Sequence, residues 1–225
     1  MSKKRNISVA LAGLAGALLL LSGCASTTPS GPSEWDGLKR VERRNVDQLF
    51  VVPDAQIGPF SSVILEPAQV SFDQNWDPNR NTRSLGRRIS QADMDRIRTD
   101  VGRMLDETFA RELTQGGYKI VTAPESETVR ISPAIVNLYI NAPDTMSAGR
   151  SQTFVMDAGR MTLFSEFRDA YSGKLLARAV DTQSGSNFGQ MQVSNSVTNS
   201  AEAQRAMTNW ARTLVRGLDS LHKAP

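Results

Sequence analysis

Cysteine and histidine are almost absent from this chain, since one residue of each occurs among 225. A Ser-His-Asp triad and a Cys-His pair both need a histidine, and zinc sites draw on several cysteines and histidines. The single histidine, His222, lies beside Lys223 near the end of a predicted helix, where a cation interacts favourably with the helix dipole. The composition therefore argues against a zinc centre and a histidine-dependent active site, and we expect no cofactor.

Phosphate-binding loops and the nucleophile elbow are also missing. No G-x-x-x-x-G-K-S/T, G-x-G-x-x-G or G-x-S-x-G motif occurs. The spacing Asp73-x-Asn75-x-Asp77 resembles the opening of a calcium loop, which needs Gly at its sixth position and Glu at its twelfth. Pro78 and Ser84 occupy those two positions, so we expect a solvated turn and no bound metal.

Most of the chain carries no net charge. The formal charge is +3, from 26 basic and 23 acidic residues. Lys3, Lys4 and Arg5 account for all of it, because without these three the chain has 23 residues of each sign. The sequence pI of about 9.2 therefore reflects the first few residues. Nucleic-acid binding needs a clustered basic footprint, and we expect no nucleic-acid partner.

One long uncharged run is present. Ile7–Leu21 follows the three basic residues and holds apolar and small side chains. Its 15 residues at ~1.5 Å each give a helix of ~22 Å, short of the ~30 Å hydrocarbon core of a bilayer. A positive start, a short apolar region and small residues at the cut are the layout of a secretory signal. We therefore favour a cleaved signal peptide over a permanent membrane span.

The run ends in Leu21-Ser22-Gly23-Cys24, which resembles the bacterial lipobox. In proteins of that type the cysteine thiol receives a diacylglycerol, the chain is cut before the cysteine, and the new amine is acylated. One acyl chain binds a membrane weakly, whereas two or more hold firmly. The resemblance thus implies cleavage between Gly23 and Cys24 and a lipid anchor on Cys24. By the lipoprotein sorting rule, Ala25 favours the outer membrane, with the domain on the periplasmic face. The alternative is a plain signal peptide with a chance cysteine.

Composition divides the chain into three parts: a signal peptide at 1–23, a lipidated cysteine with a flexible polar tether at 24–33, and one periplasmic domain at 34–225. Alternating apolar residues and turn signals predict strands at 46–52, 62–66, 68–72, 118–122, 129–140, 159–169 and 174–181. The alternation within 129–140 changes phase near Pro133–Val136, which predicts a β-bulge there.

Two helices are predicted from apolar stripes with three- and four-residue spacing. The first begins after Ser90, which forms an approximate capping box with Asp93, and it ends at Gly116-Gly117; the second begins at Asn199. Each stripe covers one face, so both helices must lie on a sheet. The predicted fold class is therefore α/β (α+β): a two-layer sandwich of a mostly antiparallel sheet with two helices packed on one face.

Carboxylates are the remaining candidates for catalysis. Glu166 is predicted to stand mid-strand and to face away from the apolar side, and Asp157, Asp169 and Asp181 bracket the same hairpin. A pair of carboxylates could run acid–base or glycosidic chemistry. Charged residues on an exposed sheet face are common, however, and we favour that interpretation.

Two loops are candidate partner-binding regions. The loop 75–88 gathers arginines beside an aromatic residue, and arginine forks suit the carboxylates and phosphates of cell-envelope polymers. Its residues of interest are Trp76, Arg80, Arg83, Arg87 and Arg88. The loop 141–152 is long for a compact domain, and such loops are often functional. Its candidate contact residues are Pro143, Asp144, Ser147 and Arg150. A solvated loop is the alternative for the arginine loop, and we favour it.

Several blocks of the sequence resemble one family. They are WDGL at 35–38, SQADMDRIRTDV at 90–101, NLYINAPDTMSAGRS at 137–151, MTLFSEFRDAYSGKLLARAVD at 161–181 and NSVTNSAEAQRAMTNWA at 195–211. Together they resemble a family of uncharacterised bacterial lipoproteins known as domain of unknown function 3313. The resemblance implies a Gram-negative cell-envelope lipoprotein, and it supplies no activity and no catalytic residues.

We therefore expect a non-enzymatic lipoprotein held at the outer membrane by Cys24. Its periplasmic domain would bind an envelope protein or a cell-wall component in an assembly or accessory role. One alternative is an enzyme that uses Glu166 and Asp169 on peptidoglycan or glycan. The other is a carrier of a lipid or small ligand between the sheet and the helices, which a fully packed interface under Phe109 and Trp210 would contradict.

Overall fold

A computed structural model of the chain describes residues 31–53, 59–80, 88–140, 154–155, 159–184, 192–193 and 196–222. The chain divides into two units, Met1–Gly31 and Pro32–Pro225, and every described helix and strand belongs to the second. The predicted signal peptide and Cys24 lie outside the described residues. Neither helix in the described ranges has both the length and the apolarity needed to cross a bilayer.

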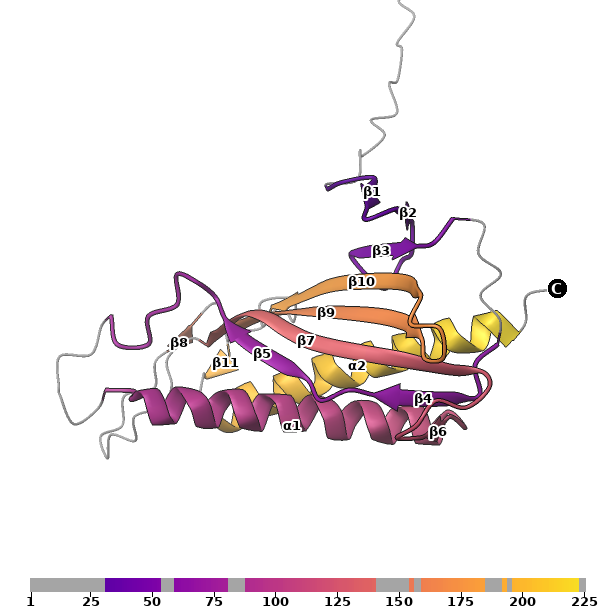
Figure 1. Cartoon of the computed structure of the whole chain (residues 1–225). Helices are drawn as coiled ribbons and strands as arrows, with labels where there is room; N and C mark the ends of the chain where they lie inside the picture. The colour runs from indigo at the N-terminus through magenta and orange to yellow at the C-terminus, as the bar shows by residue number, and fades with distance from the viewer. Residues whose placement is uncertain are drawn as a thin grey trace, which may run out of the picture. The chain divides into compact units, whose positions relative to one another are not determined.

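Nine of the described strands form one sheet (Figure 1). In spatial order, eight of them are β1 (Glu34–Trp35), β2 (Leu38–Val41), β3 (Gln48–Val51), β10 (Leu175–Ser184), β9 (Gly159–Asp169), β7 (Thr128–Ile140), β4 (Ser62–Leu65) and β6 (Lys119–Ile120). The ninth strand, β5 (Gln69–Phe72), pairs with the later part of β7, beyond the residues that pair with β4. Neighbours from β1 to β7 are antiparallel, whereas β4, β5 and β6 join in parallel. The sheet is thus mostly antiparallel, as predicted. A separate pair consists of β8 (Phe154–Val155) and β11 (Gln192–Val193).

The first helix, α1 (Gln91–Gln115), begins where the sequence predicts. The Ser90 hydroxyl accepts a hydrogen bond from the backbone N–H of Asp93 (3.2 Å), and the Asp93 carboxylate accepts one from the backbone N–H of Ser90 (3.0 Å). These two bonds complete the predicted capping box. Gly117 follows the helix at φ +89°, a left-handed conformation that glycine adopts without strain.

The second helix, α2 (Ser196–His222), begins three residues before the predicted start at Asn199. Ser, Thr and Asn all favour helix N-caps, and several of them occur together at 194–200. The residue types alone therefore do not fix which of them begins the helix.

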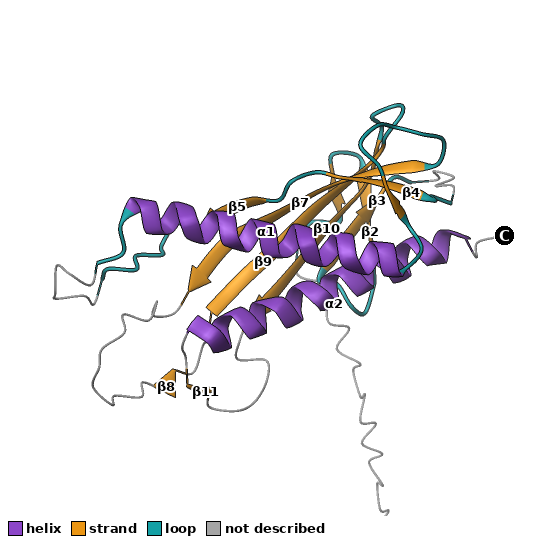
Figure 2. Ribbon diagram, turned by 90° about the horizontal axis from the view of Figure 1, so that it is seen from below, coloured by secondary structure: helices purple, strands orange, loops and turns teal. Residues whose placement is uncertain are grey.

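Both helices lie on one face of the sheet (Figures 1 and 2). The sheet side of the core between the two layers includes Val63, Val129, Ile131, Ile135 and Leu163, and the helix side includes Leu105, Phe109, Leu113, Met207 and Trp210. Burying one large side chain such as Phe109 or Trp210 stabilises a fold by ~2–3 kcal/mol. This arrangement is the predicted two-layer sandwich.

The bulge in β7 lies later than predicted. Burial alternates from Val129 to Val136, and the register against β9 shifts between Val136 and Tyr139. Asn137 is the extra residue, since it is exposed and has a φ of +55°, a region that Asn tolerates better than most residues. The predicted range, Pro133–Val136, ends where this shift begins, and Pro133 itself stays in the ladder.

On the opposite face of the sheet, the β1–β2 hairpin covers part of β3 and β9. The Trp35 ring contacts the rings of Phe50 and Phe164, with centroids 5.5 and 5.7 Å apart. Phe50 and Leu38 are fully buried there. Neither β1 nor β2 is predicted from the sequence, because strands this short carry little alternation.

Candidate functional site

A cavity of about 600 Å³ lies beside α2, on the side of the sheet that the helices cover. Its lining comes from β3, β9, β10, α2 and the segment 42–46, and most of it is apolar. The large apolar side chains that line it include Phe60, Phe109, Leu163, Phe167, Trp210 and Leu214. Ligand pockets typically enclose ~300–1,000 Å³, with mainly apolar walls and a few polar groups. This cavity therefore has the size and character of a small-molecule site.

Two small side chains on β10 create the hollow. Strand pairing places Ala179 between Ser165 of β9 and Leu49 of β3, and Ala177 lies in the same way opposite Phe167. An alanine side chain ends at its Cβ, so the space that a larger residue would fill above this part of the sheet stays open. Both alanines are only half-buried although they face the helix side of the sheet.

The cavity also contains a buried hydroxyl without a partner. Ser165 is 2% exposed, and no hydrogen-bond partner for its Oγ occurs among the described residues. Most buried polar groups are hydrogen bonded, and leaving one unpaired costs ~1–3 kcal/mol. Ser165 therefore has unused hydrogen-bonding capacity at the wall of an apolar site.

Asp181 lines the cavity next to Trp210 and is 5% exposed. Its Oδ2 accepts hydrogen bonds from Trp210 Nε1 (2.6 Å) and Gln183 Nε2 (2.7 Å), and its Oδ1 accepts one from the backbone N–H of Asp47 (2.9 Å). The exposed position predicted for Asp181 is wrong, because the alternation of β10 turns this side chain toward α2. Three donors hold the carboxylate in place, and its evident role is to fix the Trp210 ring.

Arginines surround the exposed side of the cavity. Arg43, Arg44 and Arg216 line it with exposed side chains, and we refer to these three residues as the arginine rim. The carboxylate of Glu42 lies beside them, 3.6 Å from Arg40. Among the described lining residues the rim therefore carries an excess of positive charge.

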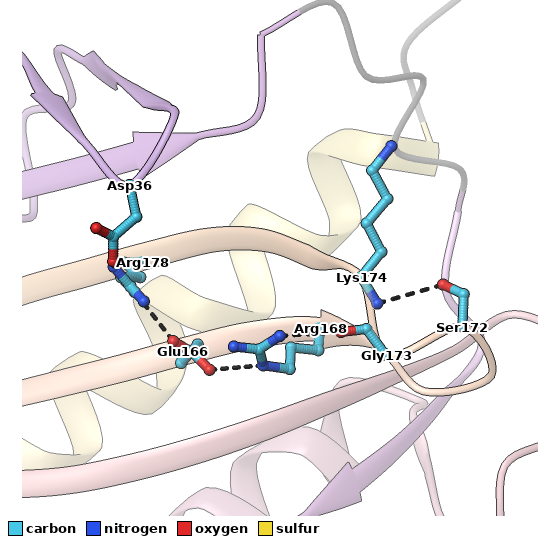
Figure 3. Close-up of polar contacts among 7 residues, drawn as sticks. All are labelled: Asp36, Glu166, Arg168, Ser172, Gly173, Lys174 and Arg178. Carbon is cyan, nitrogen blue, oxygen red and sulfur yellow. Dashed lines mark hydrogen bonds and ion pairs between the residues drawn. The ribbon is translucent and has the colours of Figure 1, made fainter.

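Among the catalytic candidates, Glu166 lies on the face of the sheet away from the cavity, between Arg168 and Arg178 (Figure 3). Glu166 accepts hydrogen bonds from Arg168 Nε (2.6 Å) and Arg178 Nε (3.0 Å). Partial burial alone would raise the pKa of Glu166, but the two guanidinium groups hold it below its ordinary value. Asp169 accepts from the backbone N–H and the hydroxyl of Ser172 (both 2.7 Å), which lowers its pKa as well. An acid–base catalyst needs a pKa near the working pH, so these carboxylates fit a structural network better.

The predicted arginine loop is described only in part. Trp76 packs against the sheet: its ring stacks on Phe72 with centroids 4.2 Å apart, and its Nε1 donates to the Ile140 carbonyl (2.9 Å). Trp76 thus fastens the loop beside the end of β7, whereas Arg80 and Arg88 are exposed. The other candidates lie outside the described residues: Arg83, Arg87, Pro143, Asp144, Ser147, Arg150 and Asp157.

The segment 73–79, whose acidic spacing resembles the start of a calcium loop, forms turns. Asp73 accepts a hydrogen bond from the backbone N–H of Asn75 (2.8 Å), and Asp77 accepts one from the backbone N–H of Asn79 (2.9 Å). Across the described part of the chain, no group of three or more metal-binding side chains comes together.

The sequence carries one signal for the cavity. Alanines alternate at 177 and 179 on the apolar side of a predicted strand, where larger residues are usual. Ser165, on the partner strand, is the one polar residue in the inward-facing series Met161, Leu163, Ser165 and Phe167. These features indicate an underfilled patch of sheet, but they do not show which helix lies above it.

The chain belongs to the family described as Protein of unknown function (DUF3313), whose model matches residues 29–214. No curated protein matches the chain. Among solved structures it is similar to the PelC dodecamer from Paraburkholderia phytofirmans, with 12% identity, 78% of this chain and 96% of that chain covered, and a TM-score of 0.35.

Two further solved structures show similarity at the same level. A candidate lipoprotein from Caulobacter crescentus CB15 has 13% identity, with 73% of this chain and 94% of that chain covered and a TM-score of 0.35. Protein XCC0632 from Xanthomonas campestris has 13% identity, with 72% and 85% covered and a TM-score of 0.38. All three TM-scores lie below 0.5, so these similarities assign neither a partner nor an assembly to this chain.

Proposed function

We propose that this chain is a non-enzymatic lipoprotein of the cell envelope, and that its folded domain binds a hydrophobic envelope component in the cavity beside α2. The cavity carries the proposal, because it combines the volume of a small-molecule site with an apolar lining. The Ser165 hydroxyl, unpartnered among the described residues, adds a polar contact point. A hydrophobic ligand would gain ~0.8 kcal/mol for each methylene that it moves from water into this lining.

The membrane attachment rests on the sequence. Cys24 ends the lipobox-like block and would carry the acyl chains, and Ala25 favours the periplasmic face of the outer membrane. Nine residues lie between Cys24 and Glu34, where the first strand begins, so ten Cα–Cα steps join the two. At ~3.5 Å per residue this tether reaches at most ~35 Å. The anchored domain would therefore stay close to the membrane lipids, which raises its effective concentration there.

The positions of the carboxylates support binding rather than catalysis. Glu166 lies on the face of the sheet away from the cavity, and two guanidinium groups keep it ionised. Asp181 lies in the cavity, but three donors hold it in place. The hydrolysis of peptidoglycan or glycan receives no comparable support from this geometry.

Fluorescence of the hydrophobic probe N-phenyl-1-naphthylamine, titrated with the mature chain, tests the proposal. Ala179→Phe adds a ring to the floor of the cavity, and we expect it to lower the affinity for the probe at least about tenfold. The matched control is Val180→Phe, which adds the same ring to the next residue of β10. Val180 pairs with Phe164 on the other face of the sheet, so this variant should bind the probe as the wild type does. Equal affinities of the wild type and Ala179→Phe would refute the proposal.

A further inference from the structure

The cavity and its rim together indicate a class of ligand. We infer that the cavity binds a single-chain anionic lipid, with the alkyl chain among the apolar side chains and the head group at the arginine rim. This inference rests on the proposed function, because it names the ligand of the same cavity.

The volume of the cavity fits one alkyl chain. A water molecule occupies ~30 Å³ in the liquid, and a non-hydrogen atom of an alkyl chain needs a similar volume. The cavity of about 600 Å³ therefore has room for one long alkyl chain. Two chains of that length would need about twice the volume.

The charge at the exposed side of the cavity fits an anionic head group. Arg43, Arg44 and Arg216 line the cavity, while the carboxylate beside them, Glu42, already lies near Arg40. Guanidinium groups bind carboxylates and phosphates through paired hydrogen bonds. An amphiphile with a cationic head group would meet repulsion at the same place.

The interior of the cavity is more than an imperfectly filled core. Ser165 is buried, faces this space from β9, and leaves its hydroxyl without a partner among the described residues. A hydroxyl in such a position costs free energy unless something bonds to it. Because the head group lies at the arginine rim, only a second polar group on the lipid chain, such as a hydroxyl, would remove that cost.

The test uses the mature, lipid-anchored chain in phosphatidylcholine nanodiscs and three photoreactive hexadecyl probes. The probes differ only in the head group, which is a carboxylate, an alcohol or an amine. Mass spectrometry of cross-linked peptides distinguishes labelling of β9 and β10 from labelling by probe dissolved in the bilayer. We expect the carboxylate to label these strands at least about tenfold more than the amine, since one charge-assisted hydrogen bond contributes about that factor.

Two triple variants separate the rim from general charge effects. Replacing the arginine rim by glutamine (R43Q, R44Q and R216Q) should lower cavity labelling by the carboxylate about tenfold and leave labelling by the alcohol unchanged. The matched control removes three exposed arginines of α1 (R96Q, R103Q and R111Q), and it should leave labelling by every probe unchanged.

Each other outcome overturns the inference in a distinct way. Equal cavity labelling by the three probes would reject the anionic ligand and leave hydrophobic binding intact. No cavity labelling by any probe would reject both the inference and the proposed function. A photoreactive residue placed at Leu49 that cross-links two copies of the chain to each other would show that a second copy fills the cavity and would reject the lipid.

Discussion

Replacing Ser165 by alanine should stabilise the ligand-free domain. The Ser165 Oγ is buried and has no partner among the described residues, and an unpaired buried polar group costs ~1–3 kcal/mol. The substitution removes this cost together with a few atomic contacts worth ~0.1–0.2 kcal/mol each. We therefore expect the free energy of unfolding to rise by ~1 kcal/mol. In a domain of this size, that change raises Tm by ~2–4 °C.

Urea unfolding followed by tryptophan fluorescence measures this difference. The matched control is Thr162→Val on the same strand, because the Thr162 hydroxyl does have a partner, Thr182 Oγ1 at 3.0 Å. Removing that bonded hydroxyl should lower the free energy of unfolding by ~1 kcal/mol. If Ser165→Ala loses as much stability as Thr162→Val, the Ser165 hydroxyl is hydrogen bonded in solution and the reasoning is refuted.

Three further predictions concern the salt-bridge network, the second helix and the anchor. Glu166→Gln should lower the free energy of unfolding by ~1–2 kcal/mol at neutral pH, because the Glu166 side chain is 18% exposed and pairs with Arg168 and Arg178. Since the pKa of Glu166 is depressed in the fold, this contribution is complete above the ordinary glutamate pKa of ~4.3 and is lost as the pH falls through the lower folded value. Urea denaturation should therefore show the two proteins converging in acid, and a difference that persists there would contradict the assignment. Gly217→Ala should raise the free energy of unfolding by ~0.5–1 kcal/mol, because a Cβ there meets nothing within 4 Å, and a lower Tm in thermal unfolding would count against it. Cys24→Ser should abolish incorporation of labelled palmitate and release the protein from the membrane fraction, whereas unchanged labelling would reject the lipid anchor.

Local signals predict the elements whose causes lie within a few residues. The capping box of Ser90 and Asp93 fixes the start of α1, and Gly117 supplies the left-handed residue after it. The turn at Tyr171–Gly173 joins β9 and β10, whose alternation places Leu163 and Ser165 on the buried side. These features depend on backbone geometry and on period-2 burial, which a single sequence displays directly.

The cavity depends on contacts between distant parts of the chain, and a single sequence does not display these. From the sequence alone, Asp181 is interpreted as a surface carboxylate. In the fold, α2 brings Trp210, which is 29 residues later in the sequence, within hydrogen-bond distance of it. The arginine rim is likewise assembled from the segment 42–46 and the last turns of α2. Trp76 shows the opposite error, since beside the loop arginines it resembles a binding residue, yet it packs on Phe72.

Methyl NMR of the mature chain with isotope-labelled alanine tests the central claim most directly, namely that the cavity beside α2 binds a hydrophobic ligand. The measurement is a titration with hexadecanoate. The account predicts saturable shifts of the Ala177 and Ala179 methyl signals, which line the cavity, and no shift of Ala134, which pairs with Phe164 on the other face of the sheet. Unchanged Ala177 and Ala179 signals at saturating hexadecanoate, or equal shifts at Ala134, would contradict it.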